Sequence, residues 1–351
     1  MSIELLDGFS VYRSATDVVA RYTGLGDTSI LTLDTTGGLA GNTGSLRFAG
    51  GEGVYGGIKL DLALAKTDFN FGFRWRLNDW DAAAGSTDRF LNIGYNTSSA
   101  MVEFSIGENG AFRLYLNSGE VWDSSDDGWL LDYDRDYMFE CAFNPGTSND
   151  GVVKLYIDGV LVYETASTDF LSNDSDYFWV HTGETGDGAD FTISDLYVTD
   201  DVTDGLLYGN WMVEALTVDA DTAQADFTPI NGGTNVAEID ESNGDGDISY
   251  NYSSTTTHED RFTTTETLAS LVAKVIAVKV AMLANEDTSA ANMRLTCYEN
   301  LTKGSGASQS VVAGGADVYA PYDEVFSVNP DTSAAWTKTE VEGAEFGYEV
   351  L

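Results

Sequence analysis

Apolar and polar residues alternate most regularly in one stretch near the middle of the chain. Residues 152–157 alternate, Asp158-Gly159 follows, and a second apolar run covers residues 160–163. Period-two alternation on both sides of an Asp-Gly pair predicts two strands joined by a tight hairpin turn. Residues 189–198 alternate in the same way, which predicts a further strand.

Short runs of the same kind recur through the first 205 residues, separated by clusters of Gly, Asn, Asp and Ser. Many short strands at close spacing predict a β-sandwich or barrel. No helical period of useful length interrupts them, so we expect no helix in this part. The runs are residues 57–62, 70–77, 90–95, 102–106, 111–116 and 137–143.

A boundary between two domains is expected near residues 200–205, where an acidic stretch ends in Gly. A chain of 351 residues is also longer than a single hydrophobic core usually serves. We therefore predict one domain over residues 1–205 and a smaller one over residues 206–351. Further strands are expected at residues 211–216, 294–298 and 347–351.

The second domain contains one helix signal and one ambiguous run. Thr337 and Glu340 have the spacing of a capping box, which predicts a short helix over residues 337–345. Residues 266–284 lack Gly and Pro, but their β-branched cluster and the polar turn at 285–287 favour a strand and hairpin. The predicted fold class is all-β, with a jelly-roll sandwich followed by a smaller β-sandwich that carries one short helix.

The first domain resembles concanavalin A-like, laminin G-like jelly rolls. The resemblance rests on the opening Asp7-Gly8-Phe9, the hairpin at residues 152–164 and the strand at residues 190–198. It covers about three fifths of the chain and implies a jelly-roll sandwich, a fold that hosts many functions.

The second domain is similar to the C-terminal region of a family of tailed-phage structural proteins that carry the same two parts in the same order. This resemblance implies a virion component, without saying which part of the particle. The segments that carry it are residues 214–216 after Trp211, then 225–229, 235–241, 328–337 and 340–347.

The charge of the chain limits its partners. Its 57 acidic and 17 basic side chains give a net charge of −40. Such a field repels nucleic acid and anionic membrane, so we expect neither as a partner. The N-terminus lacks the regions of a signal peptide, and no apolar run is long enough to span a bilayer. We expect synthesis in the host cytoplasm and a final place in the virion.

Two cysteines are present, Cys141 and Cys297, each within an apolar alternating run of a different domain. Two buried free thiols are therefore favoured over a disulfide. The two histidines, His181 and His258, are interpreted as loop or edge residues, because sequence spacing supplies neither with a catalytic or metal-binding partner.

Paired carboxylates are the main enzymatic signal to consider in a jelly roll. Retaining glycoside hydrolysis needs two carboxyl groups on one face of a strand, which an E-x-D-x-E spacing provides. The nearest match, residues 238–241, lies in the second domain and turns its last glutamate to the opposite face. No such motif occurs in residues 1–205. We therefore predict no catalytic residues and a protein that is not an enzyme.

One acidic loop resembles the start of an EF-hand calcium loop. Its oxygen-bearing residues are followed by Tyr252 where the bidentate Glu should stand, which favours a solvated turn. No cofactor is required, and Ca²⁺ is the one candidate, here or at a rim loop of the first domain (residues 123–128 or 173–176). The candidate ligands are Asp240, Glu241, Asn243, Asp245 and Asp247.

Four aromatic residues lie in polar loops of the first domain, where they could stack on sugar rings. The alternative, which we favour, is that they cover the open ends of the sandwich, since large aromatic side chains are mostly buried. The candidate glycan-binding residues are Trp80, Trp122, Trp129 and Tyr133.

Taken together, the sequence predicts a non-enzymatic virion structural protein displayed on the particle surface, as a capsid decoration, fibre or tail-associated component. Its expected partners are other virion proteins, with a homo-oligomer in the particle. The first alternative is an adhesin that binds a glycan of the host surface. A glycoside hydrolase is the second and less favoured alternative.

Overall fold

The chain forms two compact units. Unit 1 comprises residues 1–9 and 14–213, and unit 2 comprises residues 10–13 and 214–351. The predicted boundary at residues 205/206 falls within residues 201–211, which lie outside the described part of the chain. The computed structural model describes residues 3–9, 12–35, 39, 44–50, 55–66, 69–80, 87–95, 99–107, 110–116, 119–128, 130–144, 151–165, 175–183, 188–200, 212–240, 248–264, 267–269, 272, 274–286, 291–312 and 319–351.

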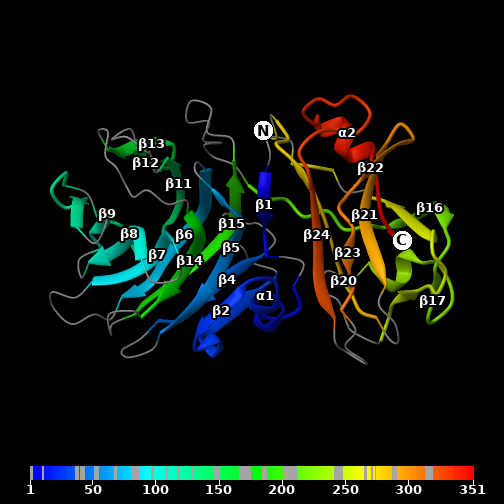
Figure 1. Cartoon of the computed structure of the whole chain (residues 1–351), viewed down its shortest axis with the longest axis horizontal. Coiled ribbons are helices and arrows are strands. Elements are labelled where there is room, and N and C mark those ends of the chain that lie inside the picture. Colours follow the sequence, from blue (N-terminus) through cyan, green and yellow to red (C-terminus); the bar gives the residue numbers. More distant parts are fainter. Residues whose placement is uncertain are drawn as a thin grey trace. The chain divides into compact units, whose positions relative to one another are not determined.

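Unit 1 contains two antiparallel sheets (Figure 1). Sheet A has the strand order β13-β12-β11-β6-β15-β4-β3, with β1 also paired to β15. Its strands are β1 (Ile3–Asp7), β3 (Leu31–Asp34), β4 (Ser45–Phe48), β6 (Phe69–Trp80), β11 (Asp136–Asn144), β12 (Val152–Ile157), β13 (Val160–Glu164) and β15 (Ala189–Thr199).

Sheet B has the strand order β10-β9-β8-β7-β14-β5-β2. Its outer strands are β10 and β2, and β14 lies between β7 and β5 although it comes much later in the sequence. The strands are β2 (Thr23–Gly26), β5 (Gly56–Lys66), β7 (Thr87–Tyr95), β8 (Ser99–Gly107), β9 (Phe112–Leu116), β10 (Gly119–Asp123) and β14 (Ser175–Thr182).

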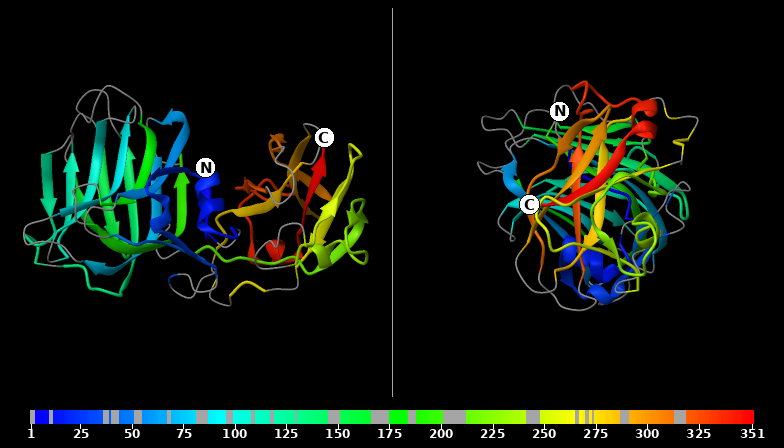
Figure 2. Two further views of the ribbon diagram at one scale, coloured as in Figure 1. Left: turned by 90° about the horizontal axis from the view of Figure 1, so that it is seen from below. Right: turned by 90° about the vertical axis from the view of Figure 1, so that its right-hand side faces the viewer.

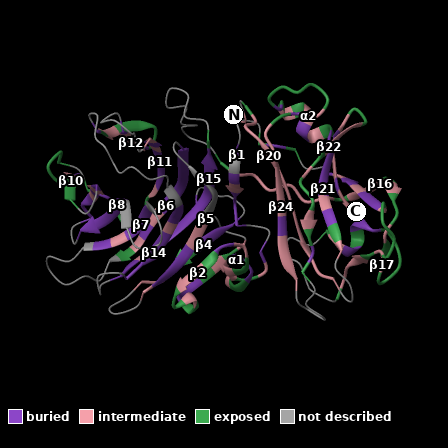
Figure 3. Cartoon of the chain, viewed as in Figure 1, coloured by how far each residue is buried: buried purple, intermediate pink, exposed green. Residues whose placement is uncertain are grey.

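An aromatic layer joins the two sheets. The ring of Phe71 on β6 lies 4.9 Å from that of Phe178 on β14. Phe104 on β8 lies 5.2 Å from Phe139 on β11. All four residues are buried, and the central strands of unit 1 are largely purple in Figure 3. Burial of each such ring contributes on the order of 2 kcal/mol, so this layer is the main stabilising contact of unit 1.

The predicted hairpin and closing strand are confirmed. β12 and β13 pair across Asp158-Gly159, whose φ values of 50° and 75° are those of a type I′ turn. β15 is the predicted strand at residues 189–198, and it pairs on both sides within sheet A.

Unit 2 is a smaller β-sandwich. A six-stranded sheet of order β16-β19-β25-β21-β22, with β23 on β21, faces the β20–β24 pair, and β17 pairs with β18. Figure 2 shows these strands in yellow-green to red from two directions. They are β16 (Ala220–Ala225), β17 (Thr228–Pro229), β18 (Asn251–Tyr252), β19 (Glu259–Thr263), β20 (Val278–Ala284), β21 (Asn292–Glu299), β22 (Thr302–Ser305), β23 (Gln309–Ser310), β24 (Ala320–Phe326) and β25 (Glu345–Val350).

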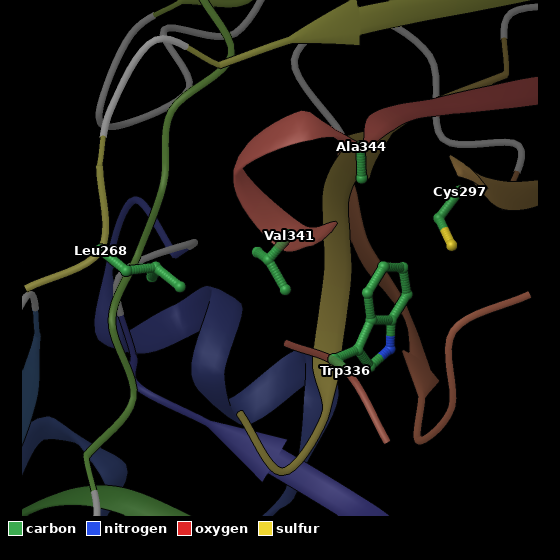
Figure 4. Close-up of a cluster of buried hydrophobic side chains, with 5 residues drawn as sticks. All are labelled: Leu268, Cys297, Trp336, Val341 and Ala344. Carbon is green, nitrogen blue, oxygen red and sulfur yellow. The ribbon is translucent and has the colours of Figure 1, made fainter. Parts of the chain in front are cut away.

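The predicted short helix of unit 2 is confirmed as α2 (Lys338–Gly343). Thr337 accepts a hydrogen bond from the backbone N–H of Glu340, whose side chain accepts one from the backbone N–H of Thr337. Val341 on α2 packs beside Trp336 in a buried cluster with Leu268, Cys297 and Ala344 (Figure 4). The indole N–H of Trp336 donates to the carbonyl oxygen of Phe326 over 2.9 Å.

Three sequence predictions of local structure were wrong. Unit 1 does contain a helix, α1 (Ala15–Arg21), which at seven residues is too short to show a helical repeat. Residues 212–216 form no strand. β20 is a strand, but it pairs with β24 and not with the strand that follows it in the sequence, so the hairpin prediction failed.

Both cysteines are buried and free, as predicted. Burial raises the pKa of Cys141 and raises that of Cys297 to about 12. In the part of the chain that the structure describes, no helix has the length and hydropathy needed to cross a membrane.

The Trp336 cluster generates a stability prediction. Trp336→Ala removes a fully buried ring, so we expect unit 2 to lose roughly 3–5 kcal/mol of unfolding free energy. Scanning calorimetry should show the melting temperature of unit 2 falling by roughly 10 °C or more. The matched control is Ile248→Ala, at a side chain that is 73% exposed, and it should change little. Equal melting temperatures for the two variants would contradict the role given to Trp336.

Candidate functional site

Strand β14 carries aromatic side chains on both of its faces. Phe178 and Val180 point into the layer between the sheets, as the contact of Phe178 with Phe71 shows. Because side chains alternate along a strand, Tyr177, Trp179 and His181 lie on the opposite, outer face of sheet B. Their rings form a series, with 4.5 Å between the first two centroids and 6.3 Å between the last two.

The strand register extends this series into a row that crosses six strands. Trp179 is opposite Lys59 on β5 and Asn92 on β7. Asn92 is opposite Glu103 on β8, which is opposite Tyr115 on β9. Tyr115 in turn is opposite Glu120 on β10. At the usual spacing of about 4.8 Å between strands, the row spans about 24 Å.

A second row lies beside the first on the same face. Arg89 is opposite Ser105, which is opposite Arg113, which is opposite Asp123. We call the two rows, with Tyr177 and His181, the polar face. Its members are Lys59, Arg89, Asn92, Glu103, Ser105, Arg113, Tyr115, Glu120, Asp123, Tyr177, Trp179 and His181.

The polar face has a buried floor and partly accessible sides. Asn92, Glu103, Ser105 and His181 are each no more than 4% exposed. Lys59, Arg89, Arg113, Tyr115 and Trp179 are half-buried. Burying this many polar groups on the outside of a sheet costs free energy that an apolar or fully solvated face would avoid. The composition of the floor is therefore not explained by folding alone.

Charges on the polar face are arranged in pairs. Arg89 lies 3.4 Å from a carboxylate oxygen of Glu103. Arg113 donates to Asp123 over 2.7 Å and lies 3.9 Å from Glu120. The phenol of Tyr115 donates to Glu120 over 3.0 Å, and burial together with Glu120 raises its pKa. Although burial works to raise it, the pKa of Asp123 is lowered by hydrogen bonds from Ser125 and Arg113.

His181 is held as a neutral imidazole. Burial, with the nearby Arg89 guanidinium, lowers its pKa from 6.5 to about 3. Its ring makes an edge contact with Tyr55 at 5.7 Å. Gly57, opposite His181 in the register, has no side chain, and a Cβ there would lie 2.6 Å from the Cβ of His181. The interpretation of His181 as a loop or edge residue was wrong, since β14 is an interior strand.

The polar face suits recognition of a polyhydroxylated ligand. Aromatic rings present flat apolar surfaces, while the amide and the carboxylates offer hydrogen-bonding groups beside them. The Oδ1 atom of Asn92 and the Nε1 atom of Trp179 are buried and have no hydrogen-bond partner within the described residues. These two residues lie opposite each other in the register.

The structure places the predicted glycan-binding residues elsewhere in unit 1. Trp122 on β10 contacts Phe112 and Tyr163, with centroids 6.0 and 5.9 Å away. Because Tyr163 lies on β13, this contact joins the edge strands of the two sheets, which matches the covering role we favoured. Tyr133 is 48% exposed, between β10 and β11. Trp80 ends β6 and its side chain is not described; Trp129 lies outside the described residues.

The predicted calcium loop is only partly described. Asp240 is described, whereas Glu241, Asn243, Asp245 and Asp247 lie outside the described residues. Among the residues that are described, no three His, Cys, Asp or Glu side chains gather as a metal site would require. Glu238 is buried and accepts a hydrogen bond from the side-chain amide of Asn231 over 2.8 Å, which gives it a structural role.

Comparison with known proteins gives only distant structural similarities. No protein-family profile matches the chain, and no curated protein matches it. An alginate lyase from Aplysia kurodai has 10% identity and a TM-score of 0.45, over 57% of this chain and 99% of the lyase. An endo-β-1,4-glucuronan lyase from Trichoderma reesei has 11% identity and a TM-score of 0.41, over 56% and 95%.

A sialidase from Trypanosoma rangeli has 13% identity and a TM-score of 0.38 over 56% of this chain. The match covers 30% of the sialidase, so the chain corresponds to less than a third of that enzyme. All three solved structures are enzymes, a finding that overturns the prediction of a protein that is not an enzyme. The missing E-x-D-x-E motif excludes only the two-carboxylate mechanism of retaining glycoside hydrolases. The prediction wrongly took its absence to exclude every enzymatic activity. Similarities this distant assign no reaction to the chain.

Sequence reasoning missed the polar face because β14, which carries Trp179 and His181, enters the sheet between β5 and β7 although it comes much later in the sequence. One local signal was available. In residues 177–181, Tyr, Trp and His alternate with Phe and Val, so both faces of the strand carry large rings. A strand in a two-layer sandwich needs only one such face for its core.

The neutral state of His181 generates a pH prediction. In the unfolded chain this histidine takes up a proton near pH 6.5, whereas the folded chain does so only near pH 3. Acid therefore stabilises the unfolded state, and stability falls as the pH drops below the unfolded pKa. Between about pH 7 and pH 5.5 the wild type should lose about 1 kcal/mol more than His181→Gln, measured by urea unfolding.

An NMR titration of the imidazole supplies a readout that does not depend on the variant. Its resonances should stay those of the neutral ring down to pH 5. Protonation near pH 6.5, or the same pH dependence in both proteins, would contradict the burial of His181.

Proposed function

We propose that unit 1 binds a polysaccharide through the polar face, and that the chain is a surface-displayed protein of a tailed-phage virion. The observation that carries the binding proposal is the row from Lys59 to Glu120, which aligns aromatic rings with polar side chains across six strands. A length of about 24 Å suits an extended polymer better than a single small molecule.

The partly accessible residues of the row support this function. Trp179 and Tyr115 present apolar ring surface, which binds the apolar faces of sugar rings. Glu120 is exposed at the end of the row and offers acceptors for sugar hydroxyls. Precisely placed polar groups beside aromatic side chains are typical of ligand sites.

The proposed place in a virion rests on the resemblance of the second half to tailed-phage structural proteins. The structure supports it by giving those residues a common role in the fold of unit 2. Asn329 is fully buried and accepts hydrogen bonds from the backbone N–H groups of Asp331 and Thr332. Trp336 and Val341 then complete the cluster beside α2. Residues that pack together in this way specify the fold of a domain. We propose that this domain, unit 2, docks on other virion proteins.

Display on a particle agrees with the charge of the chain. A net charge of −40 keeps the protein soluble at high local concentration and opposes binding to nucleic acid. In this account unit 2 supplies attachment and unit 1 supplies recognition of the host surface. Copy number and the part of the particle are questions for purified virions.

The first test of this function compares two aromatic substitutions. Trp179→Ala removes the large ring next to Lys59 in the row, and we expect binding to weaken about tenfold or more, which corresponds to about 1.4 kcal/mol. Tyr133→Ala is the matched control, because this exposed aromatic lies outside the polar face, and its binding should equal that of the wild type. Affinity electrophoresis through gels containing dextran, mannan, alginate or polygalacturonate measures the difference.

Thermal melting of both variants shows whether the fold is intact. Loss of binding in Tyr133→Ala with full binding in Trp179→Ala would move the site to the loops between β10 and β11. The same gels, stained for shortened polymer, also report any cleavage of the polysaccharide.

A further inference from the structure

The charges of the polar face differ sharply from those of the chain as a whole. Its described side chains include three cations, Lys59, Arg89 and Arg113, and three carboxylates, Glu103, Glu120 and Asp123. Among these described side chains the charges balance, while the chain carries −40. From this balance, and resting on the proposed polysaccharide-binding function, we infer that the ligand is an uncharged polysaccharide.

The two guanidinium groups of the face are already engaged by carboxylates of the protein. Arg89 lies 3.4 Å from Glu103, whose side chain is 5% exposed. Arg113 donates to Asp123, whose side chain is 11% exposed, and also lies near Glu120. An acidic sugar would have to compete with these carboxylates, and displacing one would leave a partly buried charge without its partner, which is costly.

The lysine of the row is placed against a ring. The ammonium of Lys59 lies 5.5 Å from the ring centroid of Tyr177, within the range of a cation–π contact. The ammonium charge of Lys59 lies within the negative electrostatic potential of a strongly acidic protein. A polyanion approaching the face would be repelled by that field over distances of about a Debye length, roughly 10 Å at 0.1 M salt.

Affinity electrophoresis with two uncharged and two acidic polymers tests this inference. Dextran and mannan are the uncharged probes, and alginate and polygalacturonate are the acidic ones. We expect an uncharged polymer to retard the wild-type chain equally at low salt and at ~0.5 M NaCl, because no net charge is paired on binding. The acidic polymers should give no retardation at low salt.

A charge variant sharpens the test. Glu120→Gln removes one carboxylate from the exposed end of the row and leaves Arg113 paired with Asp123. This change removes one negative charge beside Arg113, so at low salt we expect the ratio of retardation by the acidic polymers to retardation by the uncharged polymer to rise, whatever the effect on the uncharged polymer alone. The matched control is Glu164→Gln on β13 of sheet A, which should leave both classes unchanged.

The outcomes separate this inference from the proposed function. Retardation of the wild type by an acidic polymer in preference to the uncharged ones would overturn the inference and leave polysaccharide binding in place. Retardation by none of the four polymers would contradict both.

Discussion

The aromatic layer between sheets A and B is the contact on which the polar face depends. Phe178 and Val180 must face this layer, because their burial supplies much of the stability of unit 1. Strand geometry then places Trp179 and His181 on the outside of sheet B. The register fixed by the same packing aligns Asn92, Glu103 and Tyr115 with Trp179. The core and the candidate site are thus two faces of the same strands, and neither can shift without the other.

The two units place their buried polar residues differently. In unit 2 the buried Asn329 accepts hydrogen bonds from two backbone N–H groups next to the Trp336 cluster. In unit 1 four buried polar residues lie on the outer face of sheet B, beside half-buried rings: Asn92, Glu103, Ser105 and His181. The strong negative charge keeps such a protein dispersed and opposes its association with polyanions.

Local sequence signals predicted the elements that depend on neighbouring residues. The Asp158-Gly159 turn and the Thr337–Glu340 capping box are both chemistry within a few residues, and both are present in the structure. Pairings between distant segments were not predictable in this way: β20 joins β24, and β14 enters sheet B between β5 and β7. The polar face depends on the second of these pairings, which places Trp179 between Lys59 and Asn92. Trp122, chosen from its polar surroundings, instead packs between the edge strands of the sandwich.

The central claim is that the polar face, and not the loop aromatics, meets the polysaccharide. The chain contains seven tryptophans, so the indole N–H groups form a small set of NMR signals that single substitutions can assign. Titration with the uncharged polymer that retards the protein should shift the Trp179 signal and leave that of Trp122 in place. A shift of the Trp122 signal with Trp179 unchanged would contradict the account and return the site to the loops.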